Sequence, residues 1–193
     1  MVLGMLIQAG GFAVFGTVFI VRWHRFILLG ERASEGLFPP GWSLFFLAGL
    51  KVALVVLVGV IILGFVAAMP PHFLTFLIAV AGGVALGFAA ARVSLIFPAA
   101  AIERPIGLHR AWELLAGNYW RLFACLLLCY LPFGLVHYIL GEIGIGLPWV
   151  MWFALQVIGL AMSFAGAAVV ASLLSDVYRG FYPPEAETER RAS

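Results

Sequence analysis

Five apolar runs dominate this chain and limit what it can fold into. The hydrocarbon core of a bilayer is about 30 Å thick, and an α-helix crosses it in about 20 residues. A helix also satisfies its own backbone hydrogen bonds, as lipid requires. The sequence therefore predicts an all-α integral membrane protein, a bundle of about five transmembrane helices, with spans at Val2 to Val21, Ser43 to Met69, Phe73 to Phe97, Tyr119 to Leu140 and Leu147 to Val177.

The composition favours the same class of protein. Of the 193 residues, 64% are hydrophobic and 10% are charged, whereas soluble domains carry roughly 25% charged residues. So few charged side chains cannot cover a soluble body of this size. The net charge of +2 is too small to indicate a nucleic-acid partner, so the lipid bilayer is the expected partner. Cys125 and Cys129 lie one helical turn apart in one apolar run, where free cysteine acts as a small apolar residue.

The distribution of arginine predicts the orientation. With five spans, the connections after the first and third spans lie on one side with the C-terminal tail. The other side carries no lysine or arginine, so the positive-inside rule predicts a periplasmic N-terminus and a cytoplasmic C-terminus. We expect a transmembrane domain over 1–178 and a polar cytoplasmic tail over 179–193. The arginines on the basic side are Arg22, Arg25, Arg32, Arg104, Arg110, Arg121, Arg179, Arg190 and Arg191.

A polar stretch between the third and fourth spans, about 105–117, has the pattern of an amphipathic helix. Its apolar residues recur at i, i+3, i+4 and i+7, at Leu108, Ala111, Trp112 and Leu115. Such a helix lies in the membrane interface. It is either a spacer between two spans or a docking surface for a protein partner or an anionic lipid. The candidate docking residues here and at the basic end of the first span are Trp23, Arg25, His109, Arg110, Trp112, Trp120 and Arg121.

Two basic residues and one acidic residue lie inside or near the ends of predicted spans. Lys51 lies within the second span, Arg92 near the end of the third, and Asp176 near the end of the fifth. Charges inside a membrane are costly and are candidates for functional sites. Long side chains can also extend to the headgroups, which lowers that cost. Snorkelling is the favoured interpretation for Arg92, while Asp176 is the expected partner of Lys51 and Glu103 is the second choice.

Small residues repeat along the third span. Gly83 and Gly87 form a GxxxG pair, and Ala91 follows at the next step of four. Small residues allow two helix backbones to approach closely. We expect this face to pack against another helix of the same chain, and packing against a second subunit is the alternative.

Residues 20–123 contain an arginine near the end of a span, Ser-x-x-x-Pro at Ser94 to Pro98, a short amphipathic helix and Gly-Asn-x-Trp-Arg at Gly117 to Arg121. With these features the segment resembles uncharacterised bacterial inner-membrane proteins, the YciC-like family and the membrane domain attached to some glycerophosphodiester phosphodiesterases. The resemblance implies a polytopic helical bundle in the bacterial inner membrane without catalytic residues of its own. Members often have six spans, of which five are evident here. The matching residues are Arg92, Ser94, Pro98, Ala111, Trp112, Gly117, Asn118, Trp120 and Arg121.

The sequence carries no G-x-S-x-G elbow, phosphate loop or H-E-x-x-H motif. We therefore expect no catalytic residue, metal or cofactor. The leading hypothesis is a non-enzymatic accessory or scaffolding subunit that packs against a larger membrane complex or its lipids, with a homo-oligomer left open. The first alternative is a small oligomeric transporter or channel that uses Lys51 and Arg92. A membrane enzyme, the second, would depend on Glu103, His109 and Glu113.

Overall fold

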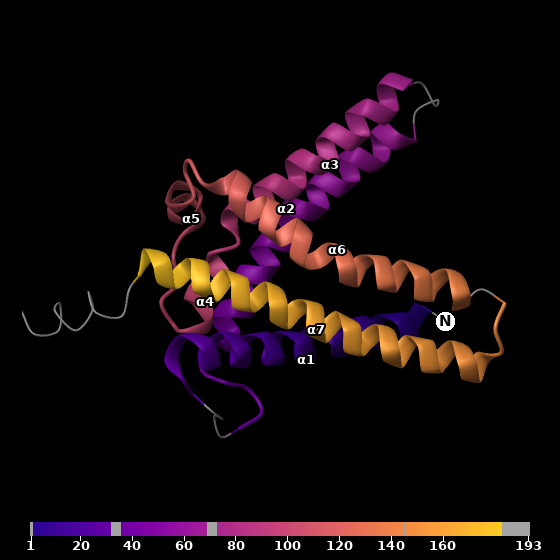
Figure 1. Ribbon diagram of the computed structural model, residues 1–193, viewed down its shortest axis with the longest axis horizontal. Coiled ribbons are helices and arrows are strands. Elements are labelled where there is room, and N and C mark those ends of the chain that lie inside the picture. Colours follow the sequence, from indigo (N-terminus) through magenta and orange to yellow (C-terminus); the bar gives the residue numbers. More distant parts are fainter. Residues whose placement is uncertain (1, 32–35, 69–72, 145, 183–193) are drawn as a thin grey trace, which may run out of the picture. The chain divides into compact units, whose positions relative to one another are not determined.

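The computed structural model describes residues 2–31, 36–68, 73–144 and 146–182, and these residues form helices and turns without any strand (Figure 1). The prediction of an all-α fold is confirmed. The helices are α1 (Val2–Leu29), α2 (Trp42–Ala67), α3 (Phe73–Val93), α4 (Ile96–Ala101), α5 (Leu108–Leu114), α6 (Tyr119–Gly144) and α7 (Trp149–Phe181).

Among the described residues, four helical segments are long and apolar enough to cross a membrane. They correspond to the last four of the five predicted spans, and the first predicted span lies within α1, which has 28 residues. The chain is therefore a multi-pass membrane protein. The four segments are Trp42–Val66, Phe73–Ala101, Tyr119–Gly144 and Trp149–Phe181.

Several helix ends differ from the predicted ones. α1 continues past Val21 to Leu29, and α6 continues to Gly144 through part of the expected glycine-rich turn. α7 runs to Phe181, so the predicted boundary at 178 falls inside a helix. Hydropathy marks where apolar residues stop, whereas a helix stops where its backbone hydrogen bonds stop.

Helix α5, which was predicted to lie in the membrane interface, is shorter than the predicted 105–117. Gly107, just before it, has an extended backbone (φ −69°, ψ 157°), and Gly117, just after it, has a left-handed backbone (φ 87°). Ala116 N–H and Asn118 N–H donate to carbonyls three residues back, which closes a turn in place of further α-helix. The described helix is therefore limited to Leu108–Leu114.

The chain forms two compact units, which are described separately: residues Pro40–Phe123 in one, and Met1–Pro39 with Ala124–Ser193 in the other. In the Pro40–Phe123 unit, α2 and α3 form an antiparallel hairpin (Figure 1). Gly59 of α2 faces Leu86 of α3, and Leu63 of α2 faces Gly82 of α3. The residue numbers rise along α2 as they fall along α3, so the two helices are antiparallel. A Cβ at Gly59 would lie 2.8 Å from Leu86 Cδ1. Glycine at these positions allows the two backbones to approach closely.

A break separates α3 from α4 at Ser94 and Leu95. Pro98 has no N–H to donate to the Ser94 carbonyl, so that carbonyl accepts from Phe97 N–H at 3.1 Å. Ser94 Oγ also donates to the Ala91 carbonyl at 2.7 Å. The predicted third span, Phe73 to Phe97, therefore contains a change of helix. After the break, α4 packs against α2, with the Phe45 and Phe97 ring centroids 5.3 Å apart.

The other unit contains α1, α7 and most of α6. Here α1 and α7 run side by side in the same direction, and Phe19 packs edge-on against Phe164 with centroids 5.2 Å apart (Figure 1). α6 runs antiparallel to α7, since His137 faces Gly159 and Phe133 faces Gly166. A Cβ at Gly166 would lie 3.1 Å from the Phe133 ring. Large side chains of α6 thus pack over glycines of α7.

Candidate functional site

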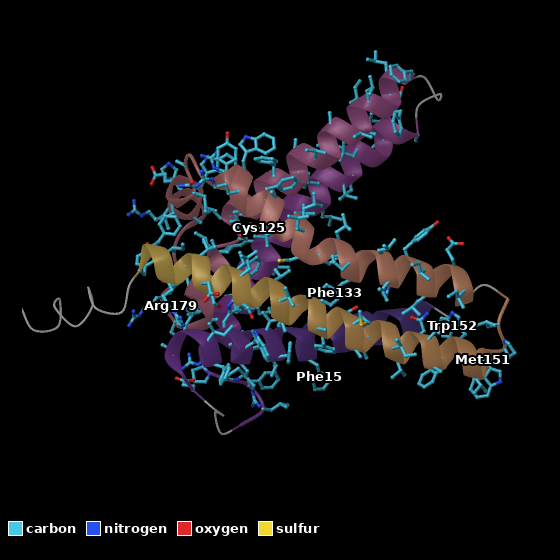
Figure 2. The ribbon with its side chains drawn as sticks, viewed as in Figure 1. Phe15, Cys125, Phe133, Met151, Trp152 and Arg179 are labelled. Atoms are coloured by element: carbon cyan, nitrogen blue, oxygen red, sulfur yellow. The ribbon has the colours of Figure 1, made fainter. Side chains whose placement is uncertain are left out.

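A row of polar contacts joins the last turns of α1 to α7. Trp23 Nε1 donates to Ser172 Oγ at 2.9 Å, and His24 Nδ1 lies 2.7 Å from Ser175 Oγ. The guanidinium of Arg179, labelled in Figure 2, donates to the carbonyl of Ile27. The three α7 residues are spaced i, i+3 and i+7 and so share one helix face. We call these residues the α1–α7 seam: Trp23, His24, Ile27, Ser172, Ser175 and Arg179.

Both serines use their hydroxyl protons within α7. Ser172 Oγ donates to the Ala168 carbonyl and Ser175 Oγ donates to the Ala171 carbonyl, each at 2.8 Å. A hydroxyl has a single proton to donate, so each oxygen acts as an acceptor toward α1. His24 must therefore donate from Nδ1, which makes Nε2 the basic nitrogen of this imidazole.

His24 is 1% exposed and lies three residues beyond the predicted end of the first span. Burial lowers the pKa of its imidazole to about 4 because the surroundings disfavour the charged form. The ring is therefore neutral at pH 7. In this neutral ring Nδ1 carries the proton that it donates to Ser175 Oγ.

Arg25 and Glu31 form a two-pronged ion pair that closes the turn after α1. Arg25 Nε donates to Glu31 Oε2 at 2.8 Å, and Arg25 Nη2 donates to Glu31 Oε1 at 2.7 Å. Gly30 makes the turn possible with its left-handed backbone (φ 70°). Arg25 itself is buried. The polar groups of Trp23 and Arg25, both candidate docking residues, thus have contacts within the chain.

In the other unit, Arg92 joins α3 to α5. Its Nε donates to the Trp112 carbonyl at 3.1 Å, and its Cζ lies 4.0 Å from the centre of the Trp112 ring. The Tyr119 ring lies on the same guanidinium at 5.0 Å. A cation over an aromatic face is stabilised by about 0.5–2 kcal/mol. The sequence identified Arg92 as a candidate, and the structure adds the two rings that hold it. We call Arg92, Trp112 and Tyr119 the arginine clamp.

An aromatic cluster lies beside the clamp, where α6 begins. Phe88 contacts Trp120, Phe123 and Tyr119, with ring centroids 4.2 Å, 4.6 Å and 5.3 Å apart. Each such pair contributes about 0.5–1.5 kcal/mol beyond its burial. Trp120 remains 61% exposed. This cluster ties the start of α6 to α3.

The amphipathic pattern of α5 is only partly matched by burial. Ala111 and Leu115 are buried, while Leu108 and Trp112 are about two-fifths exposed. On the polar face, Glu113 Oε1 lies 3.5 Å from His109 Nδ1, and Glu113 Oε2 lies 3.8 Å from Arg110 Nη1. All three side chains are at least half exposed. Exposed pairs of this kind contribute about 0–1 kcal/mol. The predicted docking residues His109, Arg110 and Arg121 are exposed in the structure.

The two remaining charged candidates belong to different units. Lys51 is exposed on α2, and Asp176 is exposed on α7. Their pairing therefore stays a prediction. Glu103, the expected second choice for Lys51, lies in the turn after α4 with a left-handed backbone (φ 59°).

Gly83 and Gly87, the two glycines predicted to pack against another helix, have different surroundings in the structure. Gly82 contacts α2, whereas a Cβ at the neighbouring Gly83 would meet nothing within 4 Å. Gly87 faces Phe123, at 3.4 Å from a Cβ built there, and Ala91 is buried. Adjacent helical residues point about 100° apart, so a shift of one position exchanges the inner and outer faces of α3.

The seam is the feature that sequence reasoning missed. Ser172 and Ser175 gave one signal, a pair of serines spaced i, i+3 in a helix rich in small residues. Their partners lie about 150 residues earlier in the chain, and no local pattern predicts such a pairing. Within the described residues, no three His, Cys, Asp or Glu side chains form a group able to hold a metal ion.

Comparisons with protein-family models, curated proteins and solved structures find no match for this chain.

Proposed function

We propose that this chain is a non-enzymatic accessory or scaffolding subunit of the bacterial inner membrane, which packs against a larger membrane complex or its lipids. The α2–α3 hairpin supports this proposal. In the most apolar stretches of Trp42–Val66 and Phe73–Ala101, no residue is buried within the chain. These helices therefore present their side chains to lipid or to other helices.

Two glycines on the outside of this hairpin favour other helices, and this observation carries the proposal. A Cβ at Gly64 or at Gly83 would meet nothing within 4 Å. Glycine inside a helix costs roughly 0.5–1 kcal/mol relative to alanine. Gly59 and Gly82 offset that cost by allowing α2 and α3 to approach each other. Gly64 and Gly83 have no such contact within the described chain, so close approach by another membrane helix gives them a role.

The polar groups of the chain also support a structural function. The α1–α7 seam and the arginine clamp each use their hydrogen bonds to hold helices together. The parallel packing of α1 and α7 also supports the proposed orientation. In a chain that crosses the membrane five times, the first and last spans run in the same direction. A periplasmic N-terminus and a cytoplasmic C-terminus follow from that orientation and from the positions of the arginines. The YciC-like resemblance implies the same class of protein.

The test compares the native chain with two variants after gentle solubilisation from native membranes. Native electrophoresis and mass spectrometry should find the chain in a larger complex. Gly83→Leu should release it, because the new side chain blocks close approach of a partner helix, and a Cβ at this position meets no atom of the described residues within 4 Å. Gly141→Leu makes the same change at another open helical position, on α6, and should leave the complex intact. A chain that migrates alone would contradict the proposal.

A small oligomeric transporter or channel is the second candidate, and Lys51 favours it. Lys51 lies nine residues into α2, about 14 Å at 1.5 Å per residue. Within the described residues it makes no hydrogen bond or ion pair. Arg92, in contrast, is held in the arginine clamp. Migration as a small homo-oligomer in the same experiment would favour transport through a path lined by Lys51.

A further inference from the structure

We propose that the arginine clamp binds the phosphate group of an anionic phospholipid. This inference rests on the proposed membrane location, but it requires no partner complex. The juxtaposition that carries it is a guanidinium fixed at Nε and covered by two aromatic rings, at the end of a membrane helix.

The hydrogen-bonding capacity of Arg92 is largely unused. A guanidinium has five N–H donors, and the Nε donor is bonded to the Trp112 carbonyl. Within the described part of the chain, Nη1 and Nη2 make no hydrogen bond or ion pair. Leaving charged donors unpaired near hydrocarbon is costly. An acceptor from outside the chain therefore stabilises Arg92.

The geometry suits a phosphate in particular. The Nε bond and the rings of Trp112 and Tyr119 restrict how the guanidinium plane can turn. A planar fork held in this way binds two phosphate oxygens at once, which a lysine ammonium cannot do. Less side-chain entropy is lost on binding because the side chain is already ordered.

The surroundings of the clamp match an anionic headgroup. Residues Pro40–Phe123 include five basic and two acidic side chains. Arg110 and Arg121 are exposed, as is Trp120 at the start of α6. Tryptophan is enriched at the level of the headgroups, and anionic lipids concentrate in the cytoplasmic leaflet, where nearby basic residues attract them.

Glu113 does not supply the missing acceptor. Its carboxylate lies near His109 and Arg110 on the exposed face of α5. Within the described residues it makes no ion pair with Arg92, whose bond to this segment is to the Trp112 carbonyl. A lipid phosphate is therefore the acceptor that the clamp is built to receive.

The experiment uses the purified full chain in mixed micelles of phosphatidylglycerol and phosphatidylcholine at equal concentration, with retained lipid counted by native mass spectrometry. The native chain should retain phosphatidylglycerol in preference. Arg92→Lys keeps the charge but loses the fork, so we expect the preference to fall roughly tenfold, as for the loss of a charge-assisted pair of hydrogen bonds. Arg190→Gln is the matched control, because it removes a full charge in the tail, and it should keep the preference.

An unchanged preference in Arg92→Lys would show that charge alone is sufficient and would overturn the proposal. A loss in Arg190→Gln as large as that in Arg92→Lys would overturn it too, because Arg190 lies outside the clamp. A native chain without any preference would also overturn it. If Arg92→Lys does not fold, Tyr119→Leu decides the question, since it removes one ring and leaves the Nε bond. A reduced preference supports the clamp, and an unchanged preference overturns it. The assay contains no other protein, so its failure leaves the scaffold proposal standing.

Discussion

Gly41 offers the most demanding test of the packing in the Pro40–Phe123 unit. It precedes α2 with a left-handed backbone (φ 79°, ψ −7°), and its carbonyl accepts from Phe45 N–H at 2.9 Å. A Cβ built on Gly41 would lie 2.6 Å from the Ala101 carbonyl oxygen and 2.8 Å from that of Ala100. Real Cβ atoms do not approach a backbone oxygen so closely. We therefore expect Gly41→Ala to separate α2 from α4.

The magnitude has two parts. A left-handed backbone costs a non-glycine residue roughly 1–2 kcal/mol. Overpacking a buried contact costs roughly 1–3 kcal/mol, and Ala100 and Ala101 are almost completely buried in α4. The free energy of unfolding should therefore fall by roughly 2–5 kcal/mol.

Gly117→Ala is the matched control. Gly117 is also left-handed (φ 87°), but a Cβ there would meet nothing within 4 Å. It should lose only the backbone part, roughly 1–2 kcal/mol. Both variants reduce the entropy of the unfolded chain equally, so their difference isolates the contact between Gly41 and α4.

The assay is unfolding of the purified chain by titration with sodium dodecyl sulfate in mixed micelles, followed by tryptophan fluorescence. Trp42, next to Gly41, begins α2 and should report on the loss of this contact. If both variants are destabilised to the same degree, the close approach of Gly41 to the α4 carbonyls does not exist in the folded protein.

Two further predictions concern the α1–α7 seam and use the same titration. Ser175→Ala removes the acceptor of the buried His24 Nδ1–H and should lower the free energy of unfolding by about 1–3 kcal/mol. Ser172→Ala removes the acceptor of the half-buried Trp23 and should lower it by about 0.5–1.5 kcal/mol. Equal small losses in the two variants would contradict the contacts assigned to the seam. The pKa of His24 is about 4 in the folded protein against 6.5 when unfolded, so the unfolded chain takes up the proton first as the pH falls. Stability should be constant above pH 6.5 with respect to this group and fall by about 3 kcal/mol toward pH 4. His24→Gln should flatten this dependence, and a variant with the full pH dependence would assign it to other groups.

The helices themselves were largely predictable. Each long apolar run can satisfy its backbone in lipid only as a helix or a closed barrel, and none alternates in polarity as a barrel strand does. The ends were less predictable. α1 extends through Arg22 and Arg25 to Leu29 because its last turns pack against α7, and a hydropathy pattern contains no record of that neighbour.

The candidate site was likewise predictable from the sequence only in part. Arg92 was identifiable because a charge inside an apolar run is conspicuous. Its contact with Trp112, 20 residues later, depends on the break at Ser94 and on the turn after α4. Gly83 was predicted as one of the packing residues, with Gly87 and Ala91, but it is its neighbour Gly82 that faces α2. A GxxxG pattern predicts that a small-residue face exists without identifying which glycine another helix covers.

The amino-acid sequence alone determined the class of protein and the number and approximate positions of the long helices, because these depend on transfer of single segments into lipid. Tertiary structure decided which side chains meet. The seam joins residues about 150 positions apart, and the clamp joins a helix to a later carbonyl and two rings. Such contacts depend on helix rotation and depth, and a rotation of one residue, about 100°, would replace every one of them.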